Sequence, residues 1–516
     1  MLAEDFNLYS HFREQILEHS DKELLRTGDD RSLSYRDMDE LSGRMASALS
    51  SLGVRPGDRV SVQVEKSPEC LALYLSCLRA GFVFHPLNMA YKTQELEYFL
   101  TNAEPEAVIC DARNEASIGA LARQAGAKHV LTLNGDGAGT LGERAESASP
   151  HFETISRSRD DLAALLYSSG TTGVPKGIML SHWNLLSNTQ TLIEAWGFTA
   201  DDRLLHALPI FHVHGLFVAN GCVLLSGASM RWLPAYKVDE VIRFLPECSV
   251  MMGVPTYYTR LLSNAAFDRD VARNVRLFVS GSAPLLEETF AAFEARTGHR
   301  ILERYGMTET NMNTSNPLEG ERKPGTVGPP LPGVEVRVTN DDGKLLDTGE
   351  IGNLEVRGPK VFLGYWRLPE KTAEDFAGDG FFKTGDNATV DADGYVSIVG
   401  RSKDMIITGG LNVYPKEVET VIDDLPGVSE SAVIGVPHPD LGEGVVAVVV
   451  GEGDSPPGEA DLIAACKQQL AGFKVPKRAV FVGQLPRNTM SKVQKNQLRK
   501  EYSALFDAAA HQDRSH

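Results

Sequence analysis

Positive charge and cysteine are both scarce in this chain, and each scarcity excludes a class of protein. Its 51 Lys and Arg residues stand against 69 Asp and Glu residues, which gives a net charge of −18 at pH 7. A surplus of acidic groups repels polyanions, so we expect neither nucleic acid nor a membrane as a partner. The six cysteines lack the spacing of metal ligands, which predicts intracellular thiols and not a disulfide framework. No export leader and no apolar run long enough to span a bilayer are visible, so we expect a cytoplasmic protein.

The length and the order of the expected elements predict two domains of unequal size. A chain of 516 residues is too long for one ordinary core. Before residue 160, apolar segments alternate with segments of helical spacing, and strands that alternate with helices form mostly parallel sheets. We expect strands at 59–64, 82–86 and 107–110 and helices at 70–79 and 93–100. The predicted fold is α/β, with a large N-terminal domain of mostly parallel sheets flanked by helices at 1–400, a short charged linker at 401–403, and a small α+β domain at 404–516.

A loop rich in glycine and hydroxyl groups follows the apolar segment 163–167, which we expect to be a strand. From residue 168 to residue 177 it reads Ser-Ser-Gly-Thr-Thr-Gly-Val-Pro-Lys-Gly. Glycines let backbone N–H groups turn toward an anion, hydroxyls donate hydrogen bonds or bind a metal, and lysine adds positive charge. A polyphosphate site fits this composition, although the spacing is not that of the GxxxxGK[ST] motif; a solvated turn is the alternative. The expected phosphate-binding residues are Ser168, Ser169, Gly170, Thr171, Thr172, Gly173 and Lys176.

This loop resembles the phosphate-binding signature of the adenylate-forming superfamily, which contains acyl-CoA synthetases, luciferases and the adenylation domains of peptide synthetases. Two later segments resemble further motifs of the superfamily in the expected order: Tyr-Gly-Met-Thr-Glu at 305–309 and Thr-Gly-Asp at 384–386. The resemblance implies ATP and coenzyme A as co-substrates and Mg²⁺ as the cofactor.

The resemblance also implies which residues bind the nucleotide. Tyr305 would stack on adenine, Thr308 would bind a phosphate, and Glu309 with Thr171 would hold Mg²⁺, a hard cation that prefers oxygen ligands. The segment Gly-Ser-Ala-Pro at 281–284 follows an expected strand, and ligands of open α/β sheets bind outside such strand ends. The other residues expected at ATP are Gly281, Ser282, Ala283, Gly306 and Met307.

The end of the large domain and the start of the small one would supply the ribose site and a hinge. Asp386 and Arg401 are expected to bind the ribose. Lys403 would be the hinge residue about which a mobile C-terminal domain rotates, and a plain charged hairpin is the alternative. Gly409 and Gly410 would then let the pantetheine arm of coenzyme A pass close to the backbone.

A lysine near the C-terminus is expected to assist catalysis. Lys492 matches the terminal lysine of the superfamily and would stabilise charge as the acyl adenylate forms. Ser491 stands where the superfamily usually has glycine. Lys495 and a solvated basic tail are the alternatives. Acetylation of Lys492 would remove its charge and is an expected form of regulation.

Arg304 limits which acids are plausible substrates. Its neighbour Tyr305 is expected to contact the nucleotide, so Arg304 would lie at or near the acid pocket. An unpaired guanidinium in a pocket for aliphatic acids is costly, whereas a second carboxylate would form a charge-assisted pair with it. The alternative is a structural ion pair, for instance with Glu303. The polar run 311–317 also favours a short, hydrophilic acid.

Two histidines lie in the segment Phe-His-Val-His-Gly at 211–215. Either could be a buried structural histidine. The superfamily's aromatic and histidine motif borders the acyl pocket and the approach of the thiol, and His212 matches it. Together with the segments at 281–284 and 303–314, it resembles bacterial malonyl-CoA synthetases. Val213 replaces a residue that is often small and polar in those enzymes, so acceptance of methylmalonate stays open. The expected acid contacts are Arg304, His212, Val213, His214, Ser282 and Met312.

We therefore predict an acid–thiol ligase with malonate, ATP and coenzyme A as substrates. Malonate would attack the α-phosphorus of ATP to give malonyl-AMP and pyrophosphate, and coenzyme A would displace AMP, with Lys492, Glu309 and His212 as the catalytic residues. The alternatives are methylmalonate or another small acid, the pantetheine arm of a carrier protein as acceptor, and a catalytically silent nucleotide-binding regulator.

Overall fold

The computed structural model describes residues 5–168, 175–408, 411–439, 441–453, 457–470, 472–488 and 492–506. The chain divides into two compact units, Met1–Val336 with Val356–Phe382, and Arg337–Glu355 with Lys383–His516. This division does not coincide with the predicted boundary at residue 400, because residues 337–355 and 383–400 group with the C-terminal part. The hinge at 401–403 stays a prediction.

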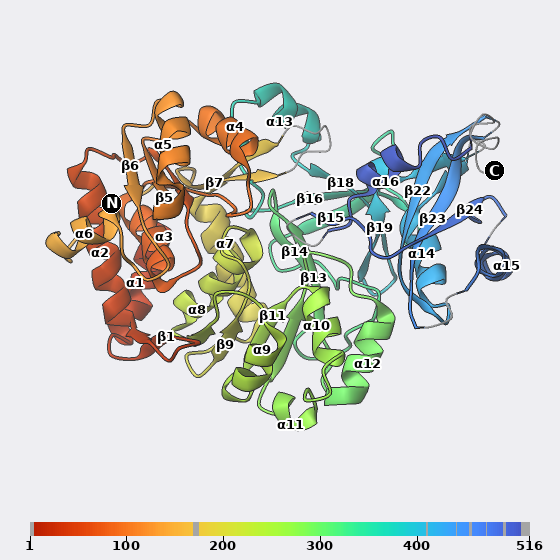
Figure 1. Ribbon diagram of the computed structural model, residues 1–516, viewed down its shortest axis with the longest axis horizontal. Coiled ribbons are helices and arrows are strands. Elements are labelled where there is room, and N and C mark those ends of the chain that lie inside the picture. The colour runs from red at the N-terminus through yellow and green to blue at the C-terminus, as the bar shows by residue number, and fades with distance from the viewer. Residues whose placement is uncertain are drawn as a thin grey trace. The chain divides into compact units, whose positions relative to one another are not determined.

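The first unit is built on two mixed, mainly parallel sheets, as predicted (Figure 1). The eight-stranded sheet has the order β14 (Asn311–Ser315), β13 (Leu302–Met307), β12 (Leu277–Ser280), β11 (Val250–Gly253), β9 (Arg203–His206), β10 (Ser229–Trp232), β1 (Glu23–Thr27) and β2 (Ser32–Ser34). The seven-stranded sheet has the order β17 (Gly364–Tyr365), β8 (Lys176–Ser181), β7 (Leu162–Ser168), β4 (Val83–Pro86), β3 (Arg59–Gln63), β5 (Ala107–Cys110) and β6 (His129–Thr132). Among the described strands of these two sheets, the antiparallel pairs lie toward the edges, at β14–β13 and β1–β2 in one sheet and at β17–β8–β7 in the other.

Helices connect these strands and follow the predicted alternation. They are α1 (Leu8–Glu18), α2 (Tyr35–Ser51), α3 (Pro68–Ala80), α4 (Thr93–Ala103), α5 (Glu115–Gln124), α6 (Thr140–Ser147), α7 (His182–Trp196), α8 (Asn220–Ser226), α9 (Val238–Phe244), α10 (Pro255–Leu262), α11 (Arg269–Ala272), α12 (Glu287–Thr297) and α13 (Pro369–Asp375). The strand β8 was not predicted. In the part of the chain that the structure describes, no helix is both long and apolar enough to cross a membrane.

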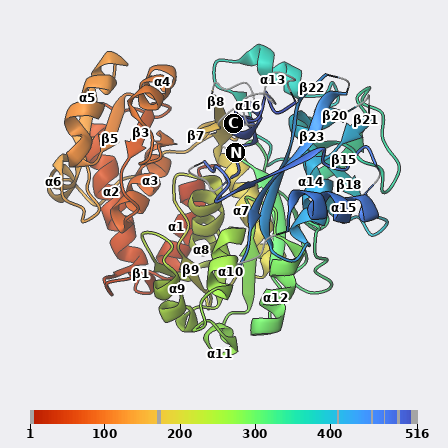
Figure 2. The same cartoon turned by 45° about the vertical axis from the view of Figure 1, so that its right-hand side comes forward.

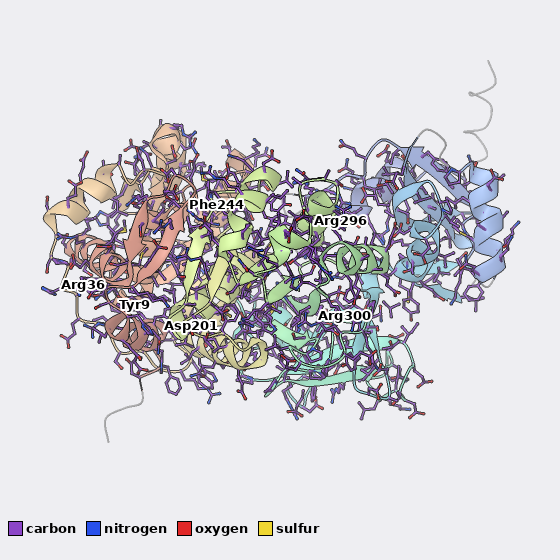
Figure 3. The ribbon with its side chains drawn as sticks, turned by 90° about the horizontal axis from the view of Figure 1, so that it is seen from below. Tyr9, Arg36, Asp201, Phe244, Arg296 and Arg300 are labelled. Carbon is purple, nitrogen blue, oxygen red and sulfur yellow. The ribbon has the colours of Figure 1, made fainter. Side chains whose placement is uncertain are left out.

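Helix α3 shows how local sequence sets an element. The Ser67 hydroxyl caps its first turn by accepting from the Cys70 N–H, and Gly81 ends it with a φ of 71°. Every residue of α3 is buried, including Arg79. The Arg79 guanidinium donates to the carbonyl of Asp39 on α2 and lies 4.6 Å from the ring centre of Tyr9 on α1. Tyr9 is labelled in Figure 3. One buried cation thereby ties three helices together.

The second unit has its own core. A four-stranded sheet has the order β15 (Glu335–Thr339), β16 (Gly352–Arg357), β18 (Phe382–Val390) and β19 (Val396–Arg401). A five-stranded sheet contains β20 (Ile406–Thr408), β21 (Leu411–Val413), β22 (Val428–His438), β23 (Gly442–Gly451) and β24 (Arg478–Val482), and Figure 2 shows β22 and β23 side by side. Its helices are α14 (Pro415–Asp423), α15 (Glu459–Gln469) and α16 (Lys495–Glu501). Pro415 occupies the first helical position of α14, as predicted.

The cysteines agree with the prediction of thiols. All six are buried and none forms a disulfide.

Candidate active site

Arg304 on β13 is a buried charged residue of the first unit. Only 2% of its surface is exposed, and its Nε and Nη2 atoms have no hydrogen-bond partner among the described residues. The Glu303 carboxylate accepts from the Leu285 N–H at 3.0 Å, and its negative charge acts on the neighbouring Arg304. Burial lowers the pKa of Arg304 to about 10, so the guanidinium stays protonated at neutral pH.

Gly281 makes room for this guanidinium. A Cβ at position 281 would lie 2.4 Å from Cζ of Arg304, so the guanidinium would have to move to admit a side chain there. Gly281 directly follows β12, so the guanidinium rests at the carboxyl end of a parallel strand, where ligands of such sheets bind. The glycine is required here by close approach and not by backbone conformation.

Ser282 and His214 lie in the same corner of the first unit as Gly281 and Arg304, at the carboxyl end of β12. Ser282 has a φ of 72°, a left-handed conformation that is rare for residues other than glycine and is common at functional sites. Its hydroxyl lies 3.4 Å from Nδ1 of His214. Burial and the nearby charge of Arg304 hold the pKa of His214 well below its usual value, so the ring is neutral. Its Nε2 has no hydrogen-bond partner among the described residues.

The other predicted acid contacts lie on the segments that carry these residues. Val213 and Met312 are buried, and His212 is half-buried with its ring centre 4.4 Å from that of Phe211. His214 opens a π-helix, His214–Ala219, which leads into α8. The structure therefore brings Arg304, Gly281, Ser282 and His214 into one corner.

The end of β13 and the turn that leads to β14 hold the predicted residues Tyr305–Glu309 of the adenine and metal sites. Gly306 must lack a side chain, because a Cβ there would lie 2.0 Å from the carbonyl oxygen of Asn311. Tyr305, Met307 and Thr308 are half-buried, and Glu309 is buried. Within the described residues no cluster of three potential metal ligands occurs. A single carboxylate fits Mg²⁺ that arrives with a polyphosphate, because this ion is commonly held by one or two carboxylates together with phosphate oxygens and water.

The predicted phosphate-binding residues Ser169, Gly170, Thr171, Thr172 and Gly173 lie outside the described residues, and of Ser168 only its place at the end of β7 is described. Lys176 begins β8, and its Nζ lies 3.7 Å from the Asp375 carboxylate and 4.2 Å from the ring centre of Tyr365.

Helix α4 fixes both ends of this loop. The Tyr98 hydroxyl donates to the carbonyl of Pro175, and the Tyr167 hydroxyl donates to the side-chain oxygen of Asn102, each at 2.6 Å. Sequence reasoning missed Tyr98 and Asn102, since nothing in the loop motif points to a helix 70 residues earlier in the chain.

The second unit brings the two predicted ribose residues together. Asp386 and Arg401 pair in register across β18 and β19, with Arg401 Nε 2.7 Å from an Asp386 carboxylate oxygen. Lys403 is exposed in a short 3₁₀-helix, Ser402–Asp404. Gly409 and Gly410 lie outside the described residues.

Lys492 and Lys495 differ in their surroundings. Lys492 is exposed, and its main chain closes a turn with Asn488. The Lys495 amine lies 2.5 Å from the Glu419 carboxylate, which also accepts from the Val433 N–H. The ion pair holds Lys495 within its own domain, and the catalytic role of Lys492 stays a prediction.

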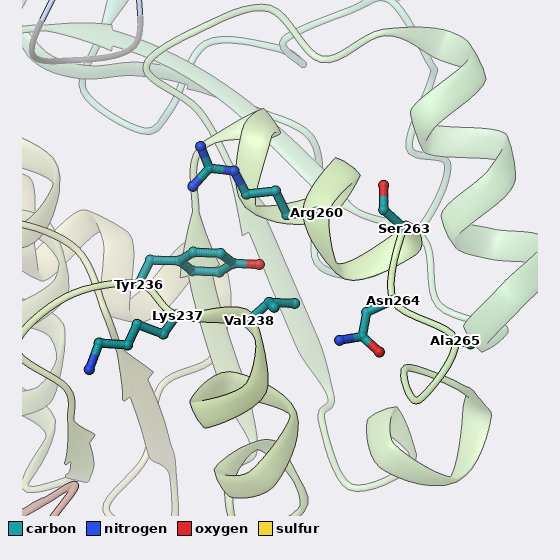
Figure 4. Close-up of a pocket in the computed structure, with 7 residues that line it drawn as sticks. All are labelled: Tyr236, Lys237, Val238, Arg260, Ser263, Asn264 and Ala265. Carbon is teal, nitrogen blue, oxygen red and sulfur yellow. The ribbon is translucent and has the colours of Figure 1, made fainter. Parts of the chain in front are cut away.

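A surface pocket of about 550 Å³ lies elsewhere in the first unit. Figure 4 shows Tyr236 and Lys237 on one side of it and Arg260, Ser263 and Asn264 on the other. The predicted site residues do not line it. Tyr236 stacks on Tyr257 at 3.9 Å between ring centres, which gives this surface a structural role.

Comparison with known proteins places the chain in a family. Residues 12–366 match the AMP-binding enzyme family, and residues 417–492 match the AMP-binding enzyme C-terminal domain. The chain belongs to the AMP-binding enzyme family, an adenylate-forming family that includes acid–thiol ligases.

Individual relatives include ligases for acids with two anionic ends. The chain is 52% identical to ATP-bound MatB from Rhodopseudomonas palustris, with a TM-score of 0.95 over 98% of this chain and 100% of that one. It is 35% identical to the malonate–CoA ligase of Arabidopsis thaliana, over 91% of this chain and 82% of that protein. It is 33% identical to the sulfoacetate–CoA ligase of Cupriavidus necator, over 92% of this chain and 94% of that protein.

Proposed function

We propose that the protein joins malonate to coenzyme A at the expense of ATP. A malonate carboxylate oxygen attacks the α-phosphorus of ATP, which forms malonyl-AMP and releases pyrophosphate. The thiol of coenzyme A then attacks the malonyl carbonyl carbon, and AMP leaves. Membership of the AMP-binding enzyme family and the similarity to a malonate–CoA ligase and to MatB support this reaction.

The buried guanidinium of Arg304 is the observation that carries the choice of malonate. Its Nε and Nη2 atoms form one edge of the guanidinium, the edge that can bind a carboxylate through two parallel hydrogen bonds. A monocarboxylic acid would leave these two buried donors without an acceptor, whereas the second carboxylate of malonate would accept from both. We assign the remote carboxylate to Arg304, and the walls of the acid site to His212, Val213, His214, Ser282 and Met312.

The other predicted site residues would bind ATP. Lys176 and the loop 168–173 would hold the phosphates, and Glu309 with Thr171 would hold Mg²⁺, which offsets phosphate charge in a protein of net charge −18. Asp386 and Arg401 would bind the ribose. We assign the adenine side of the nucleotide to Gly281, Ser282, Ala283, Tyr305, Gly306, Met307 and Thr308.

The two half-reactions would use different faces of the C-terminal domain. Lys492 would stabilise charge during adenylation, and rotation about Lys403 would replace it with Gly409 and Gly410 for the thiol step. We propose that acetylation of Lys492 would then block the first step alone. Substitution of Lys403 by proline tests the hinge: adenylation should persist while formation of the thioester falls, and unchanged overall turnover would contradict a hinge at this position.

The function is tested by supplying the purified enzyme with ATP, Mg²⁺, coenzyme A and one acid at a time, and by following release of pyrophosphate and formation of the thioester. The panel contains malonate, methylmalonate, sulfoacetate, acetate and isovalerate. Isovalerate has the shape of malonate with an isopropyl group in place of the second carboxylate. We expect malonate to give the highest kcat/KM. A preference for acetate or isovalerate would refute the assignment of Arg304 and leave only a generic ligase.

The same assay separates the other functions. Pyrophosphate release without thioester on coenzyme A would favour a carrier-protein pantetheine arm as acceptor. Nucleotide binding without pyrophosphate release for any acid would indicate a regulator.

A further inference from the structure

Lys66 joins the two large sheets of the first unit at their carboxyl ends. It lies between β3 of the seven-stranded sheet and α3, and its Nζ contacts His206, the last residue of β9 in the eight-stranded sheet. Nζ is 2.9 Å from Nδ1 and 2.8 Å from the main-chain oxygen of His206, and it lies 4.4 Å from the ring centre of Trp232. Burial lowers the pKa of Lys66 well below its usual value, so the amine depends on these contacts in place of water.

The contacts of His206 fix which of its ring nitrogens carries the proton. His206 is buried, and burial together with the charge of Lys66 holds its pKa well below the usual value, so the ring is neutral. Nε2 lies 3.0 Å from the carbonyl oxygen of Gly215, which can only accept. Nε2 therefore carries the hydrogen, and Nδ1 accepts from Lys66. Without the lysine, the tautomer with its hydrogen on Nδ1 would become available. In that tautomer Nε2 could not donate to the carbonyl of Gly215.

Gly215 links this pair to the acid site. It follows His214 and packs against the backbone of Pro209, because a Cβ on Gly215 would lie 2.0 Å from the Pro209 carbonyl oxygen. The Leu216 N–H donates to the carbonyl of His212 at 2.8 Å, which closes the turn that carries both histidines. The hydrogen bond from His206 therefore holds the first turn of the π-helix in the position that places His214 against Ser282.

We infer that Lys66 and His206 are positioning residues for the acid substrate, which act through Gly215 on the orientation of His214 beside Arg304. The inference rests on the proposed function. Lys66 does not contact the site residues directly; it sets the proton on His206, and His206 holds the turn. The expected consequence is a change in how tightly the acid binds, with little change in the nucleotide site.

The test compares two lysine-to-methionine variants at opposite ends of β9. Lys66→Met removes the donor and keeps the length of the side chain. Lys22→Met is the matched control, because Lys22 is also half-buried and its Nζ donates to two carbonyls, those of Ala200 and Gly227. Lys22 adjoins Glu23, which pairs with Arg203, the first residue of β9. Each variant is assayed for KM of malonate, KM of ATP, kcat and melting temperature.

For Lys66→Met we expect KM of malonate to rise about tenfold while KM of ATP and kcat at saturating malonate change less than about twofold. Lys22→Met should lower the melting temperature without changing KM of malonate. Lys66→Arg, which can still donate to Nδ1, should recover most of the lost affinity. His206→Gln, whose amide can donate to Gly215, should be milder than His206→Leu and keeps the test informative if Lys66→Met does not fold.

The inference is overturned if Lys66→Met leaves KM of malonate unchanged, or if it raises KM of ATP by the same factor as KM of malonate. Failure of Lys66→Arg to recover affinity would also overturn it. Absence of malonate activity in the unmodified enzyme is a different result, and it would refute the proposed function itself.

Discussion

Replacing Arg304 with methionine should convert a malonate site into one that favours an uncharged acid of the same shape. The variant keeps the length of the side chain and removes the charge and the unpartnered Nε–Nη2 edge. Truncating one member of a buried, hydrogen-bonded charge pair costs about 2–5 kcal/mol. At about 1.4 kcal/mol for each factor of ten, kcat/KM for malonate should fall roughly 30- to 3,000-fold.

The response to isovalerate should have the opposite sign. In the unmodified enzyme this acid must bind beside two buried guanidinium donors that it cannot satisfy, and methionine removes that penalty. We therefore expect kcat/KM for isovalerate to stay level or rise, while KM of ATP changes less than about twofold. The loss for malonate should be constant from pH 6.5 to 8, because a guanidinium with a pKa of about 10 remains protonated over that range.

The assay is pyrophosphate release with each acid, and Arg296→Met serves as the control. Arg296 is an exposed residue of α12, labelled in Figure 3, and its guanidinium donates to the carbonyl of Phe267. This variant should behave like the unmodified enzyme. Equal losses for malonate and isovalerate in Arg304→Met would show that Arg304 supports the fold of the site and does not recognise a carboxylate.

Three further predictions concern the nucleotide, the catalytic lysine and stability. Lys492→Ala should block adenylation yet still convert supplied malonyl-AMP to the thioester, and failure in both half-reactions would contradict its role. Tyr98→Phe removes the hydrogen bond to Pro175, which is worth about 0.5–1.5 kcal/mol, and should raise KM of ATP roughly 2- to 10-fold; Tyr91→Phe, in the same aromatic cluster, should not. Lys360 is 1% exposed, and burial lowers its pKa to about 7, so the folded protein binds fewer protons than the unfolded chain between pH 7 and about 10. Stability relative to Lys360→Met should therefore rise with pH above 7 by about 1.4 kcal/mol per unit and be flat below pH 7, as measured by melting temperatures of both proteins; a flat difference above pH 7 would refute it.

Those parts of the fold that follow from local pattern were predictable. The strands at 59–64 and 107–110 and the helices at 70–79 and 93–100 occur close to those bounds, because each has a continuous apolar run or a helical spacing. The strand β8 was missed because it pairs with β7 across the loop, a contact that no periodicity reveals.

The residues of the candidate site also divide into those that local sequence predicted and those that only the structure brings together. Arg304 and His214 were predicted from their neighbours in sequence, and the structure adds that Gly281 and Ser282 lie against them. The pair formed by Lys66 and His206 spans 140 residues and could not be inferred from either segment alone. The local signal is a lysine in the short loop between a buried strand and a helix, at the carboxyl end of the strand.

The close approach of the Arg304 guanidinium to Gly281 favours one order for any change of substrate in this scaffold. While arginine occupies position 304, a methyl group at 281 would lie 2.4 Å from its Cζ, so a change at 281 made first would have to displace the buried guanidinium. Once the arginine is gone, the vacated volume becomes available to a side chain from 281, and the corner can be refilled with apolar atoms. A route from diacid to monoacid therefore passes through position 304 before position 281, and the reverse route must restore the glycine before the cation.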